Sequence, residues 1–275
     1  MADKSTPMME QYRRIRRSLP DDTILFFRLG DFYEMFFDDA TEAAKVLDIA
    51  LTKRHKVPMC GVPYHAASSY LAKLLRAGKK VAVCDQVEDP SEARGIVRRE
   101  VTRVVTPGTI LEEQVLDSKR HNYLAGLVVK ESRIGLAMLD LSTGSFWIEQ
   151  SDDPESARDA LFKNAPSECV VPEELRDHPA VCDVLAGRSG VLTAYEDWPF
   201  EPDAAADLLV RQLNVHSLDG FGCGDCPEAV RAAGGMLHYV TMELKRRADH
   251  VRSLHVRRSS DAMMMDESTV SNLEL

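Results

Sequence analysis

The sequence has no long hydrophobic run. No apolar stretch approaches the roughly 20 residues needed to cross a bilayer, and residues 1–7 lack the apolar core of a signal peptide. Hydrophobic residues make up 44% and charged residues 28% of the 275-residue chain, which is typical of folded proteins and leaves room for two compact domains. These absences predict a cytoplasmic protein that makes no contact with a membrane.

The sequence also lacks a cysteine framework. Its six cysteines are scattered, and a chain of this length without a secretion signal does not need disulfides, so we expect reduced thiols. Cys223 and Cys226 have the spacing of a metal or redox pair, but no second pair or histidine cluster accompanies them. Because a structural zinc site normally has four ligands, we interpret this segment as a Gly-rich turn and expect no metal site.

An excess of positive charge is missing as well, and the negative charge is unevenly distributed. The formal net charge is −10. Residues 1–120 contain 20 basic and 18 acidic side chains, which leaves 14 of the 34 basic and 26 of the 44 acidic side chains for the remainder. The two parts are therefore expected to meet different partners, and the acidic part favours contact with protein over contact with DNA.

Periodicity and turn residues predict an α/β fold for the first part of the chain. Residues 7–19 have the apolar spacing of an amphipathic helix, whose other face carries arginines that are either solvated or close to phosphates: Arg13, Arg14, Arg16 and Arg17. The other predicted elements are strands at 23–28, 32–36, 80–84 and 101–105 and helices at 38–47 and 66–77. A polar stretch that extends to about residue 120 is interpreted as a linker.

The second part is predicted to form a mixed sheet flanked by helices. The predicted strands are 123–129, 134–140, 145–149, 169–171 and 191–193, and the predicted helices are 155–164, 203–213 and 227–247. Three consecutive strands followed by alternating helices and strands are typical of such a sheet. The stretch from about 250 to 275 begins a helix-like pattern and stops without a cap, so we interpret it as the truncated start of a third domain.

The predicted strand at 32–36 contains the most informative residues. Successive strand residues point to opposite faces, so Phe32 and Glu34 are expected to project together while Tyr33 and Met35 point into the core. A phenylalanine beside a carboxylate on one exposed face is unusual. From composition alone, a Phe packed at a domain edge next to a solvated Glu remains the simpler interpretation.

Several motifs favour a functional role for Phe32 and Glu34 over this simpler interpretation, because the motifs occur in the order found in one family. The segment Gly30–Phe36, followed by Asp38–Ala40, resembles the mismatch-recognition motif of bacterial MutS proteins. Further segments that resemble the same family are 51–54, 58–66, 70–74, 103–109, 139–144, 211–214, 220–222, 265–266 and 272–275. The resemblance covers essentially the whole chain.

The resemblance implies a division into domains. It assigns residues 1–110 to a mixed-sheet α/β mismatch-recognition domain, 111–121 to a linker, and 122–247 to a connector domain with a ribonuclease-H-like α/β fold. Residues 248–275 would begin the helical core and lever domain. The family's ATPase domain binds ATP and Mg²⁺ with a Gly-x-x-x-x-Gly-Lys-Ser/Thr loop that this sequence lacks. We therefore expect this chain to hold no cofactor and to be no enzyme.

The resemblance also implies how a mispaired base is probed. Phe32 would enter the minor groove and wedge beside the mispair, where it unstacks a base step at lower cost than in paired DNA. Glu34 would form a hydrogen bond with the displaced base, to which a protonated carboxyl can donate. Selectivity would then depend on how easily the DNA deforms rather than on which bases are present.

Other residues are candidates for positioning the DNA. Lys53, Arg54 and Arg76 could contact phosphates, with a solvated side chain as the alternative for each. Pro63, Tyr64 and His65 belong to a segment shaped by Gly and Pro that could approach DNA, although a packed, hydrogen-bonded His65 fits equally well. No partner-contact residues can be assigned in the second part.

The implied partners are mismatched or looped duplex DNA and, through the connector domain, the protein MutL. A homodimer is expected for full-length family members, and a monomer is compatible with this chain by itself. The expected location is the bacterial cytoplasm, in association with the nucleoid.

Two other functions remain open. A ribonuclease-H-like, metal-dependent nuclease would use Asp140 at a strand end, but Glu149, Asp152 and Asp153 are only loosely placed to complete the cluster of carboxylates that two metals need. A protein-interaction module of a MutS-like paralogue is the second alternative. The intact segment from Phe32 to Glu34 argues against it, because recombination-type paralogues generally lack that motif.

Overall fold

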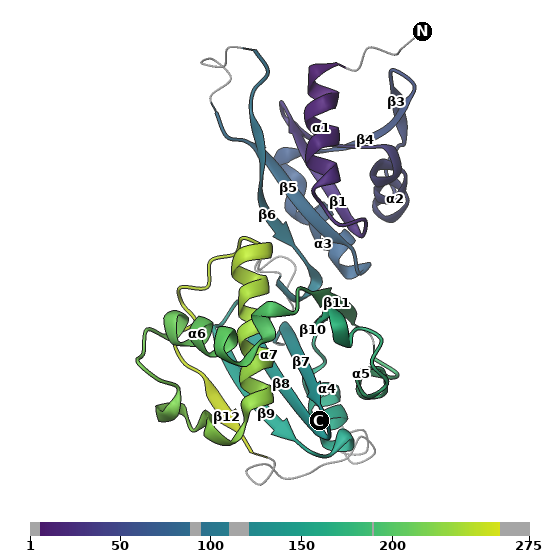
Figure 1. Cartoon of the computed structure of the whole chain (residues 1–275). Coiled ribbons are helices and arrows are strands. Elements are labelled where there is room, and N and C mark those ends of the chain that lie inside the picture. Colours follow the sequence, from purple (N-terminus) through teal and green to yellow (C-terminus); the bar gives the residue numbers. More distant parts are fainter. Residues whose placement is uncertain (1–5, 89–94, 110–120, 189, 259–275) are drawn as a thin grey trace. The chain divides into compact units, whose positions relative to one another are not determined.

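The computed structural model describes residues 6–88, 95–109, 121–188 and 190–258 (Figure 1). The chain divides between Pro107 and Gly108 into two compact units, called here the N-terminal unit and the C-terminal unit. Each unit is built on its own six-stranded sheet with both parallel and antiparallel neighbours, which confirms the predicted α/β class. Among the described residues, no helix is both long and apolar enough to span a membrane.

The N-terminal sheet has the strand order β3-β4-β2-β1-β5-β6, in which only β1 and β5 are parallel neighbours. Its strands are β1 (Thr23–Leu29), β2 (Phe32–Phe36), β3 (Thr52–Arg54), β4 (Val57–Pro63), β5 (Lys80–Gln86) and β6 (Arg99–Val105). The helices are α1 (Pro7–Arg17), α2 (Phe37–Leu47) and α3 (Ala67–Arg76), with short 3-10 turns η1 (Tyr64–Ala66) and η2 (Pro107–Thr109). The elements predicted for this part are confirmed. The sequence did not reveal β3 and β4, because β4 contains two prolines and a glycine, which are depleted in strands.

A tight hairpin joins β1 to β2. Leu29 pairs with Phe32, so Gly30 and Asp31 form a two-residue turn. Gly30 has a φ of +56°, a conformation that glycine adopts without a steric penalty and that hairpins with Gly at the first turn position require. The turn fixes the register, and a slip by one residue would move Phe32 to the opposite face of the sheet.

Tyr12 of α1 anchors the aromatic core of the N-terminal unit. Its ring meets those of Phe27 and Phe36 edge-on, with centroid distances of 5.4 and 5.0 Å. Its hydroxyl donates to the Phe36 carbonyl at 3.3 Å. Arg16, from the predicted basic face of this helix, donates to the buried carboxylate of Asp39 at 3.1 Å. This arginine therefore stabilises the unit rather than standing in solvent.

The C-terminal sheet has the strand order β11-β10-β7-β8-β9-β12. Its strands are β7 (Tyr123–Lys130), β8 (Arg133–Asp140), β9 (Ser145–Ser151), β10 (Glu168–Pro172), β11 (Val191–Tyr195) and β12 (His255–Arg257). The helices are α4 (Pro154–Asn164), α5 (Pro179–Leu185), α6 (Pro202–Leu213) and α7 (Pro227–His238), and the short turns are η3 (Glu173–Leu175), η4 (Trp198–Phe200), η5 (Asp219–Phe221), η6 (Cys223–Asp225) and the π-type turn η7 (Tyr239–Glu243).

Helices cover both faces of this sheet. On one face, Leu161 of α4 and Val181 of α5 share a buried cluster with Leu127 of β7. On the other face, α7 runs along β7 and β8 (Figure 1). Two glycines permit its close approach: a Cβ on Gly126 would lie 2.6 Å from the Ala232 carbonyl oxygen, and one on Gly135 only 2.1 Å from the Glu228 carbonyl carbon.

The segment after α7 differs from the prediction. The helix predicted for 227–247 ends at His238 and continues as the π-type turn. Where a helical segment was predicted to begin, the described residues form β12, which pairs in parallel with β9, and Val251 and Leu254 are buried. The open edge of β9 supplies backbone partners that no local sequence pattern reveals. Residues 259–275 and nearly all of the predicted linker lie outside the described part of the chain.

Candidate nucleic-acid interface

Phe32 and Glu34 share one face of β2. The Phe32 side chain is 46% exposed, whereas Tyr33 and Met35 on the opposite face are 5% and 0% exposed. Glu34 is half-buried. The alternation predicted from the sequence is therefore present, and it leaves an aromatic ring beside a carboxylate directly after a two-residue hairpin turn.

Strand β4 supplies the surface on which these two side chains lie. Phe32 pairs with Pro63, and Glu34 pairs with Gly61. A Cβ on Gly61 would lie 3.6 Å from Cγ of Glu34 and 3.9 Å from Cδ1 of Phe32. Because Gly61 has no side chain, Phe32 and Glu34 can lean over this strand without obstruction.

Arg54 of β3 completes this face with an ion pair. Its Nη1 lies 2.8 Å from Oε2 of Glu34. The sequence suggested Arg54 as a phosphate contact and did not anticipate this pairing. Only the strand order places the two residues together, since 20 positions separate them along the chain.

A second cluster lies behind the hairpin turn. The guanidinium carbon of Arg28 is 3.5 Å from the centre of the Tyr64 ring. Arg28 also donates to the carbonyl of Gly30, and the Tyr64 N–H donates to the carbonyl of Asp31 at 2.8 Å. Arg28 was not among the candidates predicted from the sequence, although strand alternation could have placed it opposite Tyr33.

Tyr33 is locked from the buried side of β2. Its hydroxyl donates to Oδ1 of Asp85 at 2.6 Å, and the hydroxyl of Thr102 donates to Oδ2 of the same carboxylate at 2.8 Å. Burial, followed by the hydrogen bond to Asp85, raises the pKa of Tyr33, so the phenol remains a neutral donor. The strand that presents Phe32 is therefore also held by a side chain of β5, on the far side of β1 in the sheet.

The remaining candidates are more scattered. Lys53 precedes Arg54 on β3 and therefore faces the other side of the sheet. His65 is exposed in η1, next to the exposed Tyr64, and Arg76 is the exposed last residue of α3. The structure thus brings together Phe32, Glu34, Arg54 and Pro63 on one face, whereas the ring of Tyr64 lies against Arg28 on the Tyr33 side.

In the C-terminal unit, two of the four carboxylates considered for a nuclease, Asp140 and Asp153, have structural partners. Asp140 is buried and accepts hydrogen bonds from the N–H and hydroxyl of Ser142, at 2.9 and 2.6 Å, and lies 2.7 Å from Nδ1 of His121. Burial acts to raise the pKa of Asp140, but these hydrogen bonds outweigh it and lower that pKa. Asp153 caps α4 by accepting from the N–H groups of Glu155 and Ser156. Within the described residues, no group of three or more His, Cys, Asp or Glu side chains is arranged to hold a metal.

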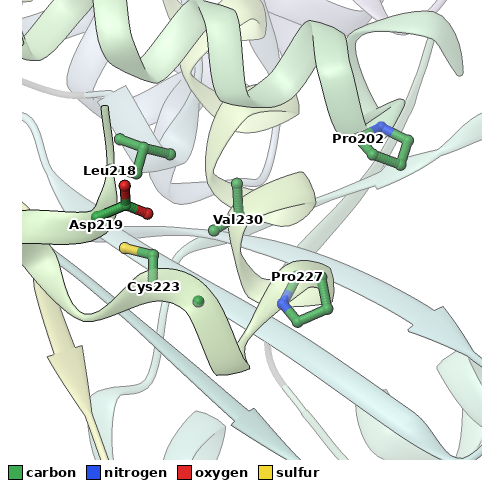
Figure 2. Close-up of a pocket in the computed structure, with 7 residues that line it drawn as sticks. Pro202, Leu218, Asp219, Cys223, Pro227 and Val230 are labelled. Atoms are coloured by element: carbon green, nitrogen blue, oxygen red, sulfur yellow. The ribbon is translucent and has the colours of Figure 1, made fainter. Parts of the chain in front are cut away.

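The cysteine pair lies beside a shallow pocket. Cys223 and Cys226 are each 5% exposed, and the Cys226 thiol donates to the Cys223 carbonyl at 3.3 Å. Figure 2 shows the pocket, which has a volume of about 190 Å³ and is lined by Pro202, Leu218, Asp219, Cys223, Gly224, Pro227 and Val230. Asp219 is the one charged side chain of this lining and accepts from the hydroxyl of Ser217 at 3.0 Å. The arrangement offers an apolar wall and no set of reactive groups.

Comparison with known proteins gives consistent matches along the chain. The family described as MutS domain I matches residues 6–114, and the family described as MutS domain II matches residues 122–252. Among curated relatives, the DNA mismatch repair protein MutS of Desulfatibacillum aliphaticivorans is 44% identical over 280 residues, which cover 100% of this chain and 31% of the relative. The protein of the same name from Myxococcus xanthus is 45% identical over 276 residues, covering 98% of this chain and 31% of the relative. The chain thus spans about a third of the length of the curated relatives it matches.

Proposed function

This chain belongs to the MutS family, and we propose on that basis that it recognises mispaired bases in duplex DNA during mismatch repair. The observation that carries the proposal is the position of Phe32. This residue is 46% exposed, directly after a two-residue turn that fixes the register of the hairpin. A rigidly presented aromatic ring is what a wedge between base steps requires.

In the proposed mechanism, Phe32 enters the minor groove and unstacks one base step. Unstacking costs a few kcal/mol in correctly paired DNA and less where pairing is already faulty. The protein therefore binds where the duplex deforms most easily, and one wedge can serve many kinds of mispair. The contacts that hold the hairpin reduce the motion that DNA binding would otherwise have to suppress.

Glu34 is proposed to hydrogen-bond the displaced base. It projects from the same face of β2 as Phe32, two residues along the strand, so a base pushed aside by the ring meets the carboxyl group. Arg54, Lys53 and Arg76 are proposed phosphate contacts, and Pro63, Tyr64 and His65 are proposed to lie against the DNA. Of these, Arg54 and Pro63 have the strongest support, because they lie on the same face as Phe32 and Glu34.

The C-terminal unit is proposed to act as the connector that relays the bound state to MutL. Its supporting feature is charge: 26 of the 44 acidic side chains of the chain follow residue 120, which suits contact with protein better than contact with DNA. We propose no catalytic step and no cofactor for this chain. ATP and Mg²⁺, the homodimer and the cytoplasmic, nucleoid-associated location are proposed for the full-length protein.

The wedge can be tested by fluorescence of 2-aminopurine placed next to a mispair. Unstacking by Phe32 should raise the fluorescence on binding, and Phe32→Ala should abolish that rise. A matched control is Phe162→Ala, which removes a ring of similar exposure, 52%, from α4 of the other unit. An undiminished rise with Phe32→Ala would refute the proposed wedge.

A further inference from the structure

Arg54 reaches Glu34 across an intervening strand. Glu34 lies on β2 and Arg54 on β3, and β4 runs between them. The β4 residue opposite Glu34 is Gly61, so no side chain blocks the path there. The two charged groups meet with 2.8 Å between Nη1 and Oε2. The ion pair therefore spans three strands, and the middle strand carries no side chain opposite Glu34, while the β4 residue opposite Arg54 is Val57.

In the ion pair, the Glu34 carboxylate and the Arg54 guanidinium bind each other, although both are proposed to contact DNA. The side chain of Glu34 is 17% exposed and that of Arg54 is 43% exposed. While Oε2 of Glu34 accepts from Arg54, that oxygen is not available to a base. In the same state the Arg54 guanidinium has one donor committed and cannot present its full fork to a phosphate. A two-pronged contact of Arg54 with a phosphate through Nη1, and the use of Oε2 of Glu34 by a base, each require the pair to open.

We propose that the Glu34–Arg54 ion pair is a latch that opens when mispaired DNA binds, which makes Arg54 a specificity-determining residue. Arg54 then binds a phosphate, and Glu34 forms a hydrogen bond with the displaced base. The inference rests on the proposed function, since it concerns the same site. Opening the latch breaks the same ion pair on every duplex, but only a mispair supplies a displaced base that replaces Arg54 as the partner of Glu34, so the net cost of opening is larger on matched DNA. The latch therefore weakens binding to matched DNA more than binding to a mispair.

A double-mutant cycle tests whether the pair opens. Dissociation constants of the chain would be measured at low salt for a duplex with one G·T mispair and for its matched control. The four proteins are the wild type, Arg54→Gln, Glu34→Gln and the double variant. If DNA binding must open the pair, Arg54→Gln removes the cost of opening it in a protein that has Glu34. In the Glu34→Gln protein there is no pair to open, so the same substitution brings no such gain. The loss of mispair affinity caused by Arg54→Gln should therefore be about two- to fivefold larger in the Glu34→Gln background, the factor expected of an exposed ion pair.

Lys53→Gln provides the matched control, because Lys53 has the same charge, is the neighbour of Arg54 and faces the other side of β3. Its effect should be the same in both backgrounds. Equal losses for Arg54→Gln in the two backgrounds would mean that the pair persists on DNA and would overturn the latch. A chain with no preference for the mispair in any variant would instead refute the proposed function itself.

The free protein offers a second test that needs no DNA. Glu34→Gln should shift the side-chain N–H resonance of Arg54 in nuclear magnetic resonance spectra and leave the side-chain signals of Lys53 in place. Addition of the mispaired duplex to the wild type should then shift the carboxyl carbon resonance of Glu34. An Arg54 resonance that does not respond to Glu34→Gln would show that no pair exists to be opened.

Discussion

The guanidinium of Arg28 lies 3.5 Å from the centre of the Tyr64 ring and so joins the β1–β2 hairpin to the turn that follows β4. The Tyr64 N–H reinforces this junction by donating to the Asp31 carbonyl. Phe32 directly follows Asp31, the last residue of the turn between β1 and β2. Its position therefore depends on contacts made by a cation and an aromatic ring that stand on the other face of the sheet.

Removal of the Arg28 cation should loosen the hairpin. We expect Arg28→Ala to lower the free energy of unfolding by about 0.5–1 kcal/mol, the typical value of an exposed cation–π contact, and to reduce the preference for mispaired DNA. Arg28→Lys keeps the charge but loses the planar stack, so it should recover only part of the loss. Chemical denaturation and DNA affinity would be measured together, with the exposed Arg14→Ala on α1 as control. Full mispair preference in Arg28→Ala would show that the stack does not position Phe32.

A larger side chain at Gly61 should disturb recognition without unfolding the protein. Gly61→Val places methyl groups where Phe32 and Glu34 now lie, since even a Cβ there would be 3.6 Å from Cγ of Glu34. We expect a reduced mispair preference with unchanged or slightly raised stability, because valine favours strands more than glycine does. Gly61→Ala, which adds only ordinary van der Waals contact, should behave almost like the wild type. An unaffected Gly61→Val would contradict the role assigned to this bare strand.

Gly135 should tolerate no side chain. A Cβ there would lie 2.1 Å from the Glu228 carbonyl carbon and 2.3 Å from the Ala229 nitrogen, so α7 would have to move away from β8. We expect Gly135→Ala to lower the free energy of unfolding by about 1–3 kcal/mol or more, as overpacking does. Gly220→Ala is the control, because nothing lies within 4 Å of its added Cβ. Equal denaturation midpoints for the two variants would show that α7 does not pack as described.

His238 should make the stability of the C-terminal unit depend on pH. Its ring is buried against Trp198, with a centroid distance of 4.6 Å, and its Nδ1 lies 2.9 Å from the hydroxyl of Tyr195. Burial lowers the pKa of His238 below its ordinary value of 6.5. The unfolded chain therefore binds the proton more readily, and stability should fall as the pH drops below about 6.5 towards the lower pKa of the folded state.

Denaturation of the wild type at pH 7.5 and 5.5 would be compared with that of His238→Gln and of a control at the exposed His216, His216→Gln. Loss of His238 should flatten the decline at acid pH, whereas the control should retain it. A decline of equal size in all three proteins would mean that His238 does not contribute.

The local pattern of the sequence predicted the hairpin and most of the elements because these depend on neighbours in the chain. Alternation on β2 placed Phe32 and Glu34 on one face, and Gly30 marked the turn between Leu29 and Phe32. Strands β3 and β4 were missed. β4 contains Pro58, Gly61 and Pro63, and its pairing with β2 compensates for their poor strand propensity.

In the candidate site, too, the local sequence predicted the residue types but not the contacts that depend on strand order. Arg54 was chosen for its charge, but its partner could not be known without the order β3-β4-β2. Lys53 has the same charge and an adjacent position, yet its side chain faces the opposite side. Arg28 was overlooked because a cation near a turn has no sequence signal until Tyr64 is placed beneath it.

The most direct test of the account is the ratio of two dissociation constants, measured at low salt for a matched duplex and for the same duplex with one G·T mispair or one unpaired base. The account predicts that the chain binds the faulty duplex more tightly, and that Phe32→Ala brings the ratio to about one while the denaturation midpoint stays unchanged. A folded Phe32→Ala variant that keeps the wild-type ratio would contradict the claim that Phe32 senses the mispair.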